Sequence, residues 1–400
     1  MVVPEGYKRT EVGVIPDGWE VNTIGNLFVF KNGLNKSKEY FGYGTPIVNY
    51  TDVYSKNGIY ATDINGNVCL SNNEIKRYQI QKGDIFFTRT SETPEEVGIS
   101  SVLLEEIPNG VFSGFVLRGR PLDNSLDDCY KKYCFQTEHI RNAIIQGCTY
   151  TTRALTNGTQ LSKIYIPVPP VPEQVAIAEA LTDVDSLIES LEKLVAKKKD
   201  IKQGAMQELL TGKRRLEGFG REWEEKAIDN IAIVGRGRVI SHKEIERATS
   251  KKYPVFSSQT ANNGIMGYLD TFDFEGEYIT WTTDGVNAGT VFPRSGRFNC
   301  TNVCGTLKLI VGNNYFIANR LSMKTNEYVS INLANPKLMN NVMKSIIITI
   351  PPTLDEQTAI ANILSDMDDE IEKLTIKLNK YKQIKQGMMQ ELLTGKRRLI

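Results

Sequence analysis

Histidine is nearly absent from this chain of 400 residues, which contains only His139 and His242. So few imidazoles argue against a histidine-rich metal site and leave few candidates for a general base at neutral pH. The six cysteines form no Cys-x-x-Cys pair. We therefore expect no metal site, and we expect the cysteines to be reduced structural thiols.

Long apolar segments are also missing. The isoleucine-rich run at 346–350 is far shorter than the roughly 18 residues that span a bilayer, and the N-terminus lacks the pattern of a secretory signal. Lys and Arg total 48 against 47 Asp and Glu, which excludes an indiscriminate nucleic-acid coat but allows DNA binding by local patches. The length and the 40% hydrophobic content favour two domains. We expect a soluble cytoplasmic protein with no membrane contact.

Motifs for methylation and for nucleotide hydrolysis are absent as well. Methylation of an exocyclic amine would need a cofactor-binding glycine loop and an Asn/Asp-Pro-Pro-aromatic tetrapeptide, but Pro351-Pro352 lies between Ile350 and Thr353. No segment has the Walker form G-x-x-x-x-G-K-[ST]. The sequence thus predicts a non-catalytic chain that binds no cofactor of its own, with an unrecognised active site as the alternative.

The chain repeats itself. Residues 201–216 (IKQGAMQELLTGKRRL) match residues 384–399 (IKQGMMQELLTGKRRL) at all positions but Ala205 and Met388, with an offset of 384 − 201 = 183. The match extends upstream to EQVAIAEAL and EQTAIANIL, each after a proline-rich lead that predicts a strand-to-helix boundary. A weaker match starts with Trp-Glu before each half, while the interiors differ in length and sequence. Two variable blocks therefore alternate with two shared helices.

Each shared segment has the heptad spacing of a helix that pairs with another helix. Ile177, Leu181, Val184 and Ile188 begin the first seam, and Ile360, Leu364, Met367 and Ile371 begin the second. The first segment, Glu173–Leu210, has 38 residues. At about 1.5 Å per residue it makes roughly 57 Å of helix, which is too long for one small domain. We expect the two helices to pair antiparallel around a local two-fold axis. Acidic residues, Glu173 among them, come before the lysines along the first helix, which we interpret as a solvated charged face.

The variable blocks read as many short strands with some helix, so the predicted class is α+β, with two mostly-β domains. Their loops are rich in the residue types that contact phosphates and base edges. Turns favour several of the same residues, so each loop alone has a purely structural explanation too. Our candidate DNA contacts are Lys31, Lys36, Arg89 and Arg153 in the first block and Arg236, Arg238, Gln259 and Asn287 in the second.

A helix core requires matching hydrophobicity but not near-identity over sixteen positions. Either both copies present one surface to two copies of the same partner, or the duplication is recent. On the first explanation the partner-binding residues are Gln203, Gln207, Glu208, Lys213 and Arg214 with Gln386, Gln390, Glu391, Lys396 and Arg397.

The segments WEVNTIGNL, FTRTSETPEEVGIS, IPVPPVPEQVAIAEAL, IPPTLDEQTAIANIL and the doubled QELLTGKRRL resemble the specificity (S) subunit of type I restriction-modification systems over nearly the whole chain. The resemblance implies target recognition domains at 1–172 and 217–355, separated and followed by conserved spacer helices at 173–216 and 356–400. Each domain would read one half of a bipartite asymmetric site in double-stranded DNA.

The same resemblance implies that the paired helices set the spacing and dock two methyltransferase (M) subunits, with restriction/translocase (R) subunits joining them for adenine-N6 methylation and for restriction. S-adenosylmethionine, ATP and Mg would be bound by those partner subunits. A stand-alone coiled-coil regulator that binds DNA is a further alternative. The bases read, the gap length and self-association of the free subunit through its seams stay open.

Overall fold

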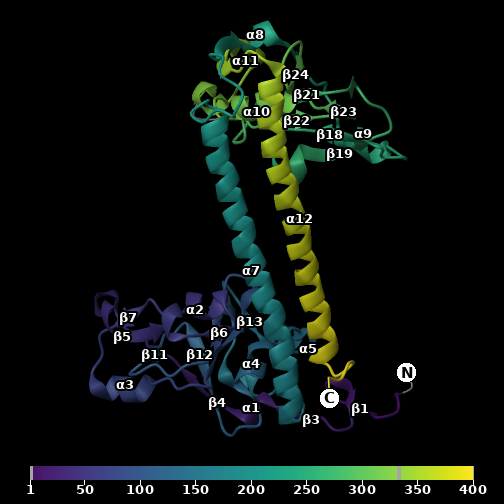
Figure 1. Cartoon of the computed structure of the whole chain (residues 1–400). Coiled ribbons are helices and arrows are strands. Elements are labelled where there is room, and N and C mark those ends of the chain that lie inside the picture. The colour runs from purple at the N-terminus through teal and green to yellow at the C-terminus, as the bar shows by residue number, and fades with distance from the viewer. Residues whose placement is uncertain (1–2, 331–334, 400) are drawn as a thin grey trace. The chain divides into compact units, whose positions relative to one another are not determined.

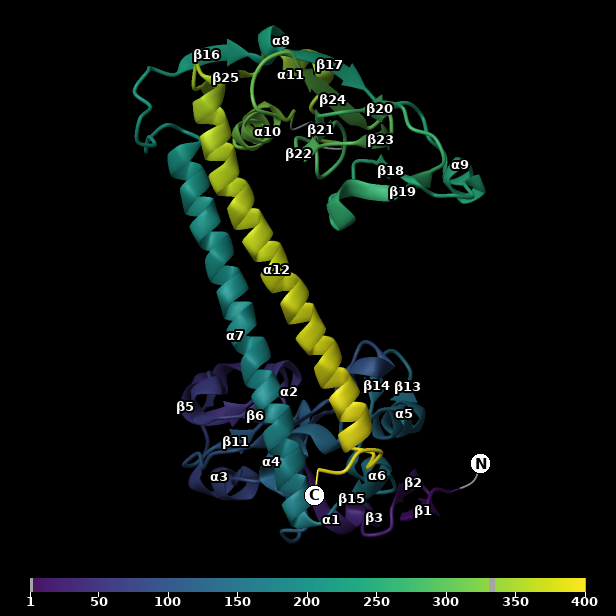
Figure 2. The same cartoon turned by 45° about the vertical axis from the view of Figure 1, so that its right-hand side comes forward.

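The computed structural model describes residues 3–330 and 335–399 (Figures 1 and 2). The chain forms two compact units: Met1–Leu191 with Lys377–Ile400, and Glu192–Ile376. Two helices of 39 residues each, α7 (Val171–Leu209) and α12 (Leu354–Leu392), contribute residues to both units. The division into segments ending at 172, 216 and 355 stays a prediction. The two compact units do not follow these segment boundaries, because each long helix packs part of its length in each unit.

The first unit is built on a five-stranded sheet with the order β4-β12-β8-β10-β6, antiparallel except for the last pair. Strand β8 is buried along its whole length. Its consecutive residues Phe86 and Phe87 pack in two different hydrophobic cores, one on each face of the sheet. This is the period-two alternation of a strand covered on both faces. The strands are β1 Tyr7–Thr10, β2 Gly13–Pro16, β3 Glu20–Thr23, β4 Phe28–Asn32, β5 Phe41–Val48, β6 Gly58–Ile59, β7 Asn67–Val68, β8 Ile85–Thr88, β9 Thr90–Ser91, β10 Ser100–Leu103, β11 Val111–Phe112, β12 Val116–Pro121, β13 Thr149–Tyr150, β14 Ala154–Leu155 and β15 Tyr165–Val168.

Smaller sheets and short helices complete the first unit. The sheets have the orders β1-β2, β11-β5-β7, β13-β14-β9 and β15-β3. The short helices are α1 Ile24–Leu27, α2 Tyr50–Ser55, α3 Asn72–Tyr78, α4 Asp128–Cys134, α5 Glu138–Gly147 and α6 Gly158–Leu161. Tyr130 and Ile140, from α4 and α5, join the same core as Phe87 and the buried seam residues Ile177 and Leu181 of α7. The start of α7 is therefore part of this domain's core.

The second unit repeats the central sheet. Its order β17-β24-β21-β22 is antiparallel throughout, as is β4-β12-β8-β10 in the first unit. The two further sheets are β19-β18-β23-β20 and β16-β25. The strands and short helices are β16 Glu224–Ala227, β17 Ala232–Arg236, β18 Tyr253–Phe256, β19 Ile265–Leu269, β20 Phe274–Glu275, β21 Tyr278–Thr282, β22 Val291–Arg294, β23 Arg297–Cys300, β24 Cys304–Leu309, β25 Ile347–Ile350, α8 Ile228–Ile231, α9 His242–Arg247, α10 Asn314–Ser322 and α11 Asn340–Ser345.

The long helices pair antiparallel within each unit. In the first unit Asp185 of α7 bonds Lys385 of α12 at 2.6 Å. In the second unit Lys198 pairs with Glu370 and Lys202 with Asp368, so the partner's number falls as the α7 number rises. Both helices begin at equivalent positions, since 354 − 171 = 183. The second lead has Thr353-Leu354-Asp355 where the first has Val171-Pro172, and this difference does not shift the start of α12.

A buried carboxylate clamps each domain to the helix pair. In the first unit the fully buried Glu173 accepts a hydrogen bond from Trp19 Nε1 at 2.8 Å. It also forms an ion pair with Arg398, which lies beyond the end of α12. We define Trp19, Glu173 and Arg398 as the first clamp. The expectation that Glu173 belongs to a solvated face was wrong, because an ionised group at this depth must be paired.

The second clamp consists of Trp223, Glu356 and Arg215. Arg215 bonds both oxygens of Glu356, with Nε at 2.7 Å and Nη2 at 2.9 Å, and Trp223 Nε1 donates to Glu356 at 3.3 Å. The offset of 183 relates Glu173 to Glu356 and Arg215 to Arg398. Each clamp thus joins the strand region before a domain, the start of one long helix and the segment after the other.

A second repeated contact lies further along each helix pair. Tyr133 donates to Asp185 at 2.8 Å, and Tyr315 donates to Asp368, the equivalent aspartate. Burial raises the pKa of both phenols, so they stay protonated and donate at neutral pH. Lys385 and Lys202 complete the two contacts by pairing with the same aspartates.

We predict that Glu173→Gln lowers the free energy of unfolding by about 1–3 kcal/mol, because Arg398 loses its charged partner. Glu179→Gln, at an exposed position on the same helix, should change it by less than about 0.5 kcal/mol. Urea denaturation followed by circular dichroism measures both variants. Equal stability of the two variants would contradict the clamp.

Candidate nucleic-acid interface

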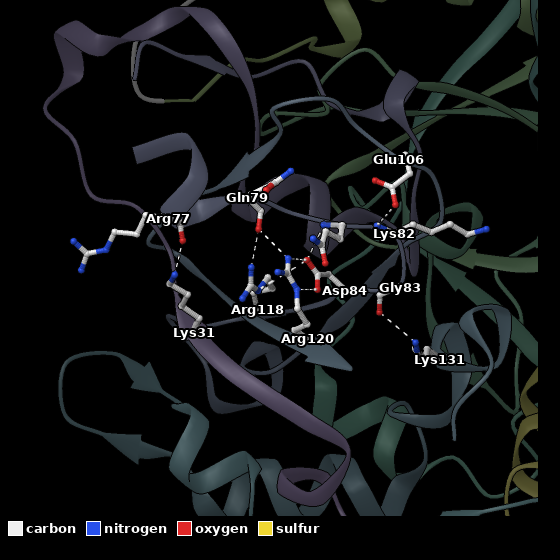
Figure 3. Close-up of polar contacts among 11 residues, drawn as sticks. Lys31, Arg77, Gln79, Lys82, Gly83, Asp84, Glu106, Arg118, Arg120 and Lys131 are labelled. Atoms are coloured by element: carbon white, nitrogen blue, oxygen red, sulfur yellow. Dashed lines mark hydrogen bonds and ion pairs between the residues drawn. The ribbon is translucent and has the colours of Figure 1, made fainter. Parts of the chain in front are cut away.

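Lys31, on β4, belongs to a group of four cations. Its Nζ donates to the backbone carbonyl of Arg77 (Figure 3). The same Nζ lies 5.6 Å from the centre of the Tyr78 ring. The pKa of Lys31 is lowered by burial, and further by Arg118, Arg77 and Arg120. We call these four residues the basic cluster. Like charges are held together there at an energetic cost, which an incoming anion would relieve.

Asp84 compensates part of this charge. The carboxylate is almost completely buried and accepts Nε and Nη2 of Arg120, both at 2.8 Å, while Arg118 Nε lies at 3.9 Å (Figure 3). Both arginines also donate to the carbonyl of Gln79, at 2.7 and 2.9 Å. The guanidinium groups are thereby fixed in place. One carboxylate against four cations suits a backbone phosphate.

Lys36 has a different environment. It pairs with Glu74 at 2.7 Å and lies 4.5 Å from the centre of the Tyr40 ring. The hydrogen bond to Glu74 raises the pKa of Lys36, and the same bond is the main reason that the pKa of Glu74 falls to about 2. The charge of Lys36 is therefore already balanced within the unit.

Arg89 lies between β8 and β9, and Arg153 lies between β13 and β14, the strand that pairs with β9. Arg89 is half-buried and donates from Nη1 to Gly114 at 3.4 Å; among the described residues its buried Nε has no hydrogen-bond partner. Arg153 is exposed and lines a cavity of about 300 Å³. The other lining residues are Tyr50, Thr90, Ser91, Glu92, Glu96 and Phe115.

Sequence reasoning missed Glu96 and Phe115 in this cavity. Phe115 is 61% exposed and gives the cavity an apolar wall beside Glu96 and Arg153. Glu96 accepts hydrogen bonds from Tyr54 at 2.9 Å and from Ser91 at 2.7 Å. The segment FTRTSETPEEVGIS contains Glu96, but the candidate DNA contacts predicted from the sequence were all cations or amides, so this carboxylate was not among them.

In the second unit the structure brings two of the four candidates, Arg236 and Asn287, together at the loop after β21. Arg236 donates to Thr283 at 3.3 Å and to Asp284 at 3.4 Å, both in this loop. Asn287, in the same loop, donates to the carbonyl of Ser258 at 3.4 Å, and Gln259 follows Ser258 directly. Arg236 and Asn287 thus meet at one loop, while Gln259 adjoins the residue that Asn287 contacts and donates from its own amide to the carbonyl of Ile265.

Arg238 is engaged elsewhere. Its guanidinium bonds both oxygens of Glu244, at 2.6 and 3.1 Å, and Asp273 at 2.9 Å. The bond to Glu244 raises its pKa. Two carboxylates neutralise this arginine, so the structure gives it a role in holding β17, α9 and the β20 region together.

All ten candidate partner-binding residues are exposed. Gln203, Gln207 and Glu208 lie on the face of α7 opposite its packed seam, and the corresponding positions of α12 lie likewise. Arg214 pairs with Glu208 at 3.7 Å, and Arg397 with Glu391 at 3.1 Å. We call these two matched surfaces the α7 stripe and the α12 stripe: Gln203, Gln207, Glu208, Lys213 and Arg214, and Gln386, Gln390, Glu391, Lys396 and Arg397.

The single difference within the sixteen-residue repeat falls at a packed position. Ala205 and Met388 are partly buried, and each packs against the core of its own unit. Surface positions usually tolerate substitution better than packed ones. Here the exposed stripes are identical while a packed position differs, which favours a constraint from outside the chain over recent duplication.

No metal-binding cluster of three or more His, Cys, Asp or Glu residues is found within 3–330 and 335–399. In the same ranges, no helix is both long and apolar enough to cross a membrane.

The fold and the interface together define a protein that carries two β-rich domains, each with a basic or amide-rich loop region, on a shared pair of long helices. A model of one family, the type I restriction modification DNA specificity domain, matches residues 16–203 and again 220–383. The chain belongs to this family. The predicted class is confirmed: α+β, with two target recognition domains alternating with two long antiparallel helices.

Among similar proteins, the type I restriction enzyme MpnII specificity subunit of Mycoplasma pneumoniae is 38% identical over 155 residues, 38% of this chain and 46% of that protein. Three other proteins of that organism, 36–45% identical, align over 42%, 64% and 50% of their own lengths. This chain thus spans about half the length of these four relatives.

The crystal structure of a type I restriction-modification S subunit from M. genitalium has the same fold, with a TM-score of 0.62 at 18% identity. The match covers 94% of this chain and 96% of that one. A chain from a structure described as showing complex assembly of the type I R-M system aligns with a TM-score of 0.55 at 12% identity, covering 96% and 99%.

If the basic cluster contacts phosphate, Lys31→Ala should weaken DNA binding on all sequences and reduce the slope of log K against log salt by about 0.9. Lys36→Ala should change the slope less, because Glu74 already neutralises that lysine. Fluorescence anisotropy with a DNA duplex at several salt concentrations measures both. A larger slope change for Lys36→Ala would refute the assignment.

Proposed function

We propose that the protein is the non-catalytic DNA-recognition subunit of a type I restriction-modification complex. Each target recognition domain reads one half of a bipartite, asymmetric DNA site, and the subunit is required for both methylation and restriction. The observation that carries the proposal is the repeated clamp: the same Trp-Glu-Arg contacts hold two domains of different sequence on one pair of helices. A shared support with different readers suits a site with two different halves.

The long helices have a second role in this proposal, because they set the gap between the two half-sites. Each is a single helix that contributes to both units, and each unit pairs α7 with α12. A helix is stiff along its axis, so its length rather than a loop would determine the spacing.

The α7 and α12 stripes are the docking surfaces for two methyltransferase subunits. Their equal sequence and exposure support two like partners on one chain. S-adenosylmethionine would then be bound by the methyltransferase subunits for adenine-N6 methylation. ATP and Mg would be bound by partner subunits as well, with restriction/translocase subunits joining the assembly in the cytoplasm.

A stand-alone DNA-binding regulator would need the domains and the helices but not matched stripes. An enzyme with an unrecognised active site would show catalysis by the purified chain alone. Mixing the chain with its cognate methyltransferase separates the three functions. The proposed one requires sequence-specific methylation that neither component supports alone.

We predict that native mass spectrometry finds two methyltransferases on each wild-type chain. Glu208→Arg should leave one methyltransferase bound, and Glu208→Arg combined with Glu391→Arg should leave none, because each reversal places a like charge beside Arg214 or Arg397 and alters one stripe. Glu372→Arg, at an exposed position of α12 outside the stripe, is the control and should still bind two. Two bound partners on the double variant would exclude the stripes as docking surfaces.

A further inference from the structure

The loop after the third strand of the central sheet is held by the same hydrogen-bond frame in both domains. In the first domain, Thr88 N donates to Ile99 O, Gly98 N to Thr88 O and Ile99 N to Thr88 Oγ1, all at 2.9 Å. Thr88 Oγ1 in turn donates to the carbonyl of Glu96 at 2.9 Å. One threonine thus uses its backbone and its side chain to close the loop.

Thr282 does the same in the second domain. Thr282 N donates to Thr290 O at 3.0 Å, Gly289 N to Thr282 O at 2.9 Å and Thr290 N to Thr282 Oγ1 at 3.2 Å. Thr282 Oγ1 donates to the carbonyl of Asn287. The loops differ in length, but Glu96 and Asn287 each lie two residues before the glycine and bond the threonine in the same way.

The two glycines close the frame with the same backbone conformation. Gly98 has φ 67° and Gly289 has φ 87°, in the left-handed region that favours glycine. A Cβ on Gly98 would lie 2.7 Å from Ile144 Cγ2, and one on Gly289 would lie 2.8 Å from Val329 Cγ2. The position of Glu96 in the first domain therefore corresponds to that of Asn287 in the second.

The side chains at this common position differ in hydrogen-bonding chemistry. Glu96 receives hydrogen bonds from Ser91 and Tyr54, which lower the pKa of its carboxyl, so it is ionised at neutral pH and only accepts. It lines the cavity with Arg153 and Phe115. A carboxylate repels phosphate, but it accepts a hydrogen bond from the exocyclic amine of cytosine or adenine in the major groove.

Asn287 carries an amide, which both donates and accepts. An amide has two donor hydrogens and an acceptor oxygen, so the bond to Ser258 does not exhaust it. The amide of asparagine matches the N6 and N7 edge of adenine with two hydrogen bonds.

We propose that Glu96 and Asn287 are equivalent base-reading residues of the two target recognition domains. Glu96 accepts from the exocyclic amine of one base in the first half-site, and Asn287 binds an adenine edge in the second. The inference rests on the proposed function, and it explains how one loop frame reads two different half-sites.

The test is a methylation map of DNA modified by the complete complex of this chain with its methyltransferase. Glu96→Gln should reduce discrimination at one position of the first half-site by roughly 5- to 150-fold and leave the second half-site unchanged. Asn287→Asp should do the reverse, affecting one adenine of the second half-site. The base required by the wild type at the relaxed position identifies it as cytosine or adenine.

Two further variants keep the test decisive if a substitution disturbs folding. Glu95→Gln, at the exposed neighbouring position, should leave both half-sites unchanged. Ser91→Ala removes one hydrogen bond that orients Glu96 and should weaken discrimination at the same base as Glu96→Gln, but less. Unchanged specificity in both loop variants, a change in the wrong half-site, or equal loss on all sequences would overturn the proposal. Failure of the proposed function would look different, because the wild-type complex itself would then show no bipartite pattern.

Discussion

A buried carboxylate with two partners from distant parts of the chain holds each half of this protein together. Glu173 and Glu356 lie at the starts of the two long helices and are almost completely buried. An unpaired charge there would cost several kcal/mol, so each glutamate requires its arginine beyond the end of the other helix. A tryptophan from the domain donates to the same carboxylate. Separating the domain from α7 and α12 in either unit would therefore leave the glutamate without its partners.

The repeated parts and the different parts of the chain have different roles. The equivalent clamps, the equivalent Tyr-Asp-Lys contacts and the antiparallel central sheets are shared by the two units. The loop frames around Thr88 and Thr282 are shared too, although the loops have different lengths. What differs is the chemistry that the frames present, a carboxylate in one and an amide in the other. This separation allows a reader to change while its support stays the same.

The repeat, the long helices and their antiparallel pairing could be predicted from the sequence, because heptad spacing and self-similarity are local patterns. The order of strands could not, since pairs such as β4 with β12 and β16 with β25 join segments that are distant in the chain. The clamps were missed for the same reason: Arg215 and Arg398 stand in runs of basic residues, and only the fold shows that they pair with buried glutamates.

The candidate DNA contacts show the limits of residue type as evidence. Lys31 and Lys36 are five residues apart, yet one lies among other cations and the other is neutralised by Glu74. Arg238 looks as suitable as Arg236 in the sequence, but Glu244 and Asp273 bind it. Glu96 is neither a cation nor an amide, and its place in the loop corresponds to that of Asn287 only through the hydrogen bonds of Thr88 and Thr282.

The most direct measurement of the central claim changes the helices and leaves both readers intact. Seven residues, one heptad, are inserted at matching points of α7 and α12, so that both clamps and the seam register are kept. At about 1.5 Å per residue and 3.4 Å per base pair, the gap between the half-sites should grow by about 3 base pairs. A methylation map of the complex should then show both half-sites unchanged at the wider gap. An unchanged gap with normal activity would contradict the account.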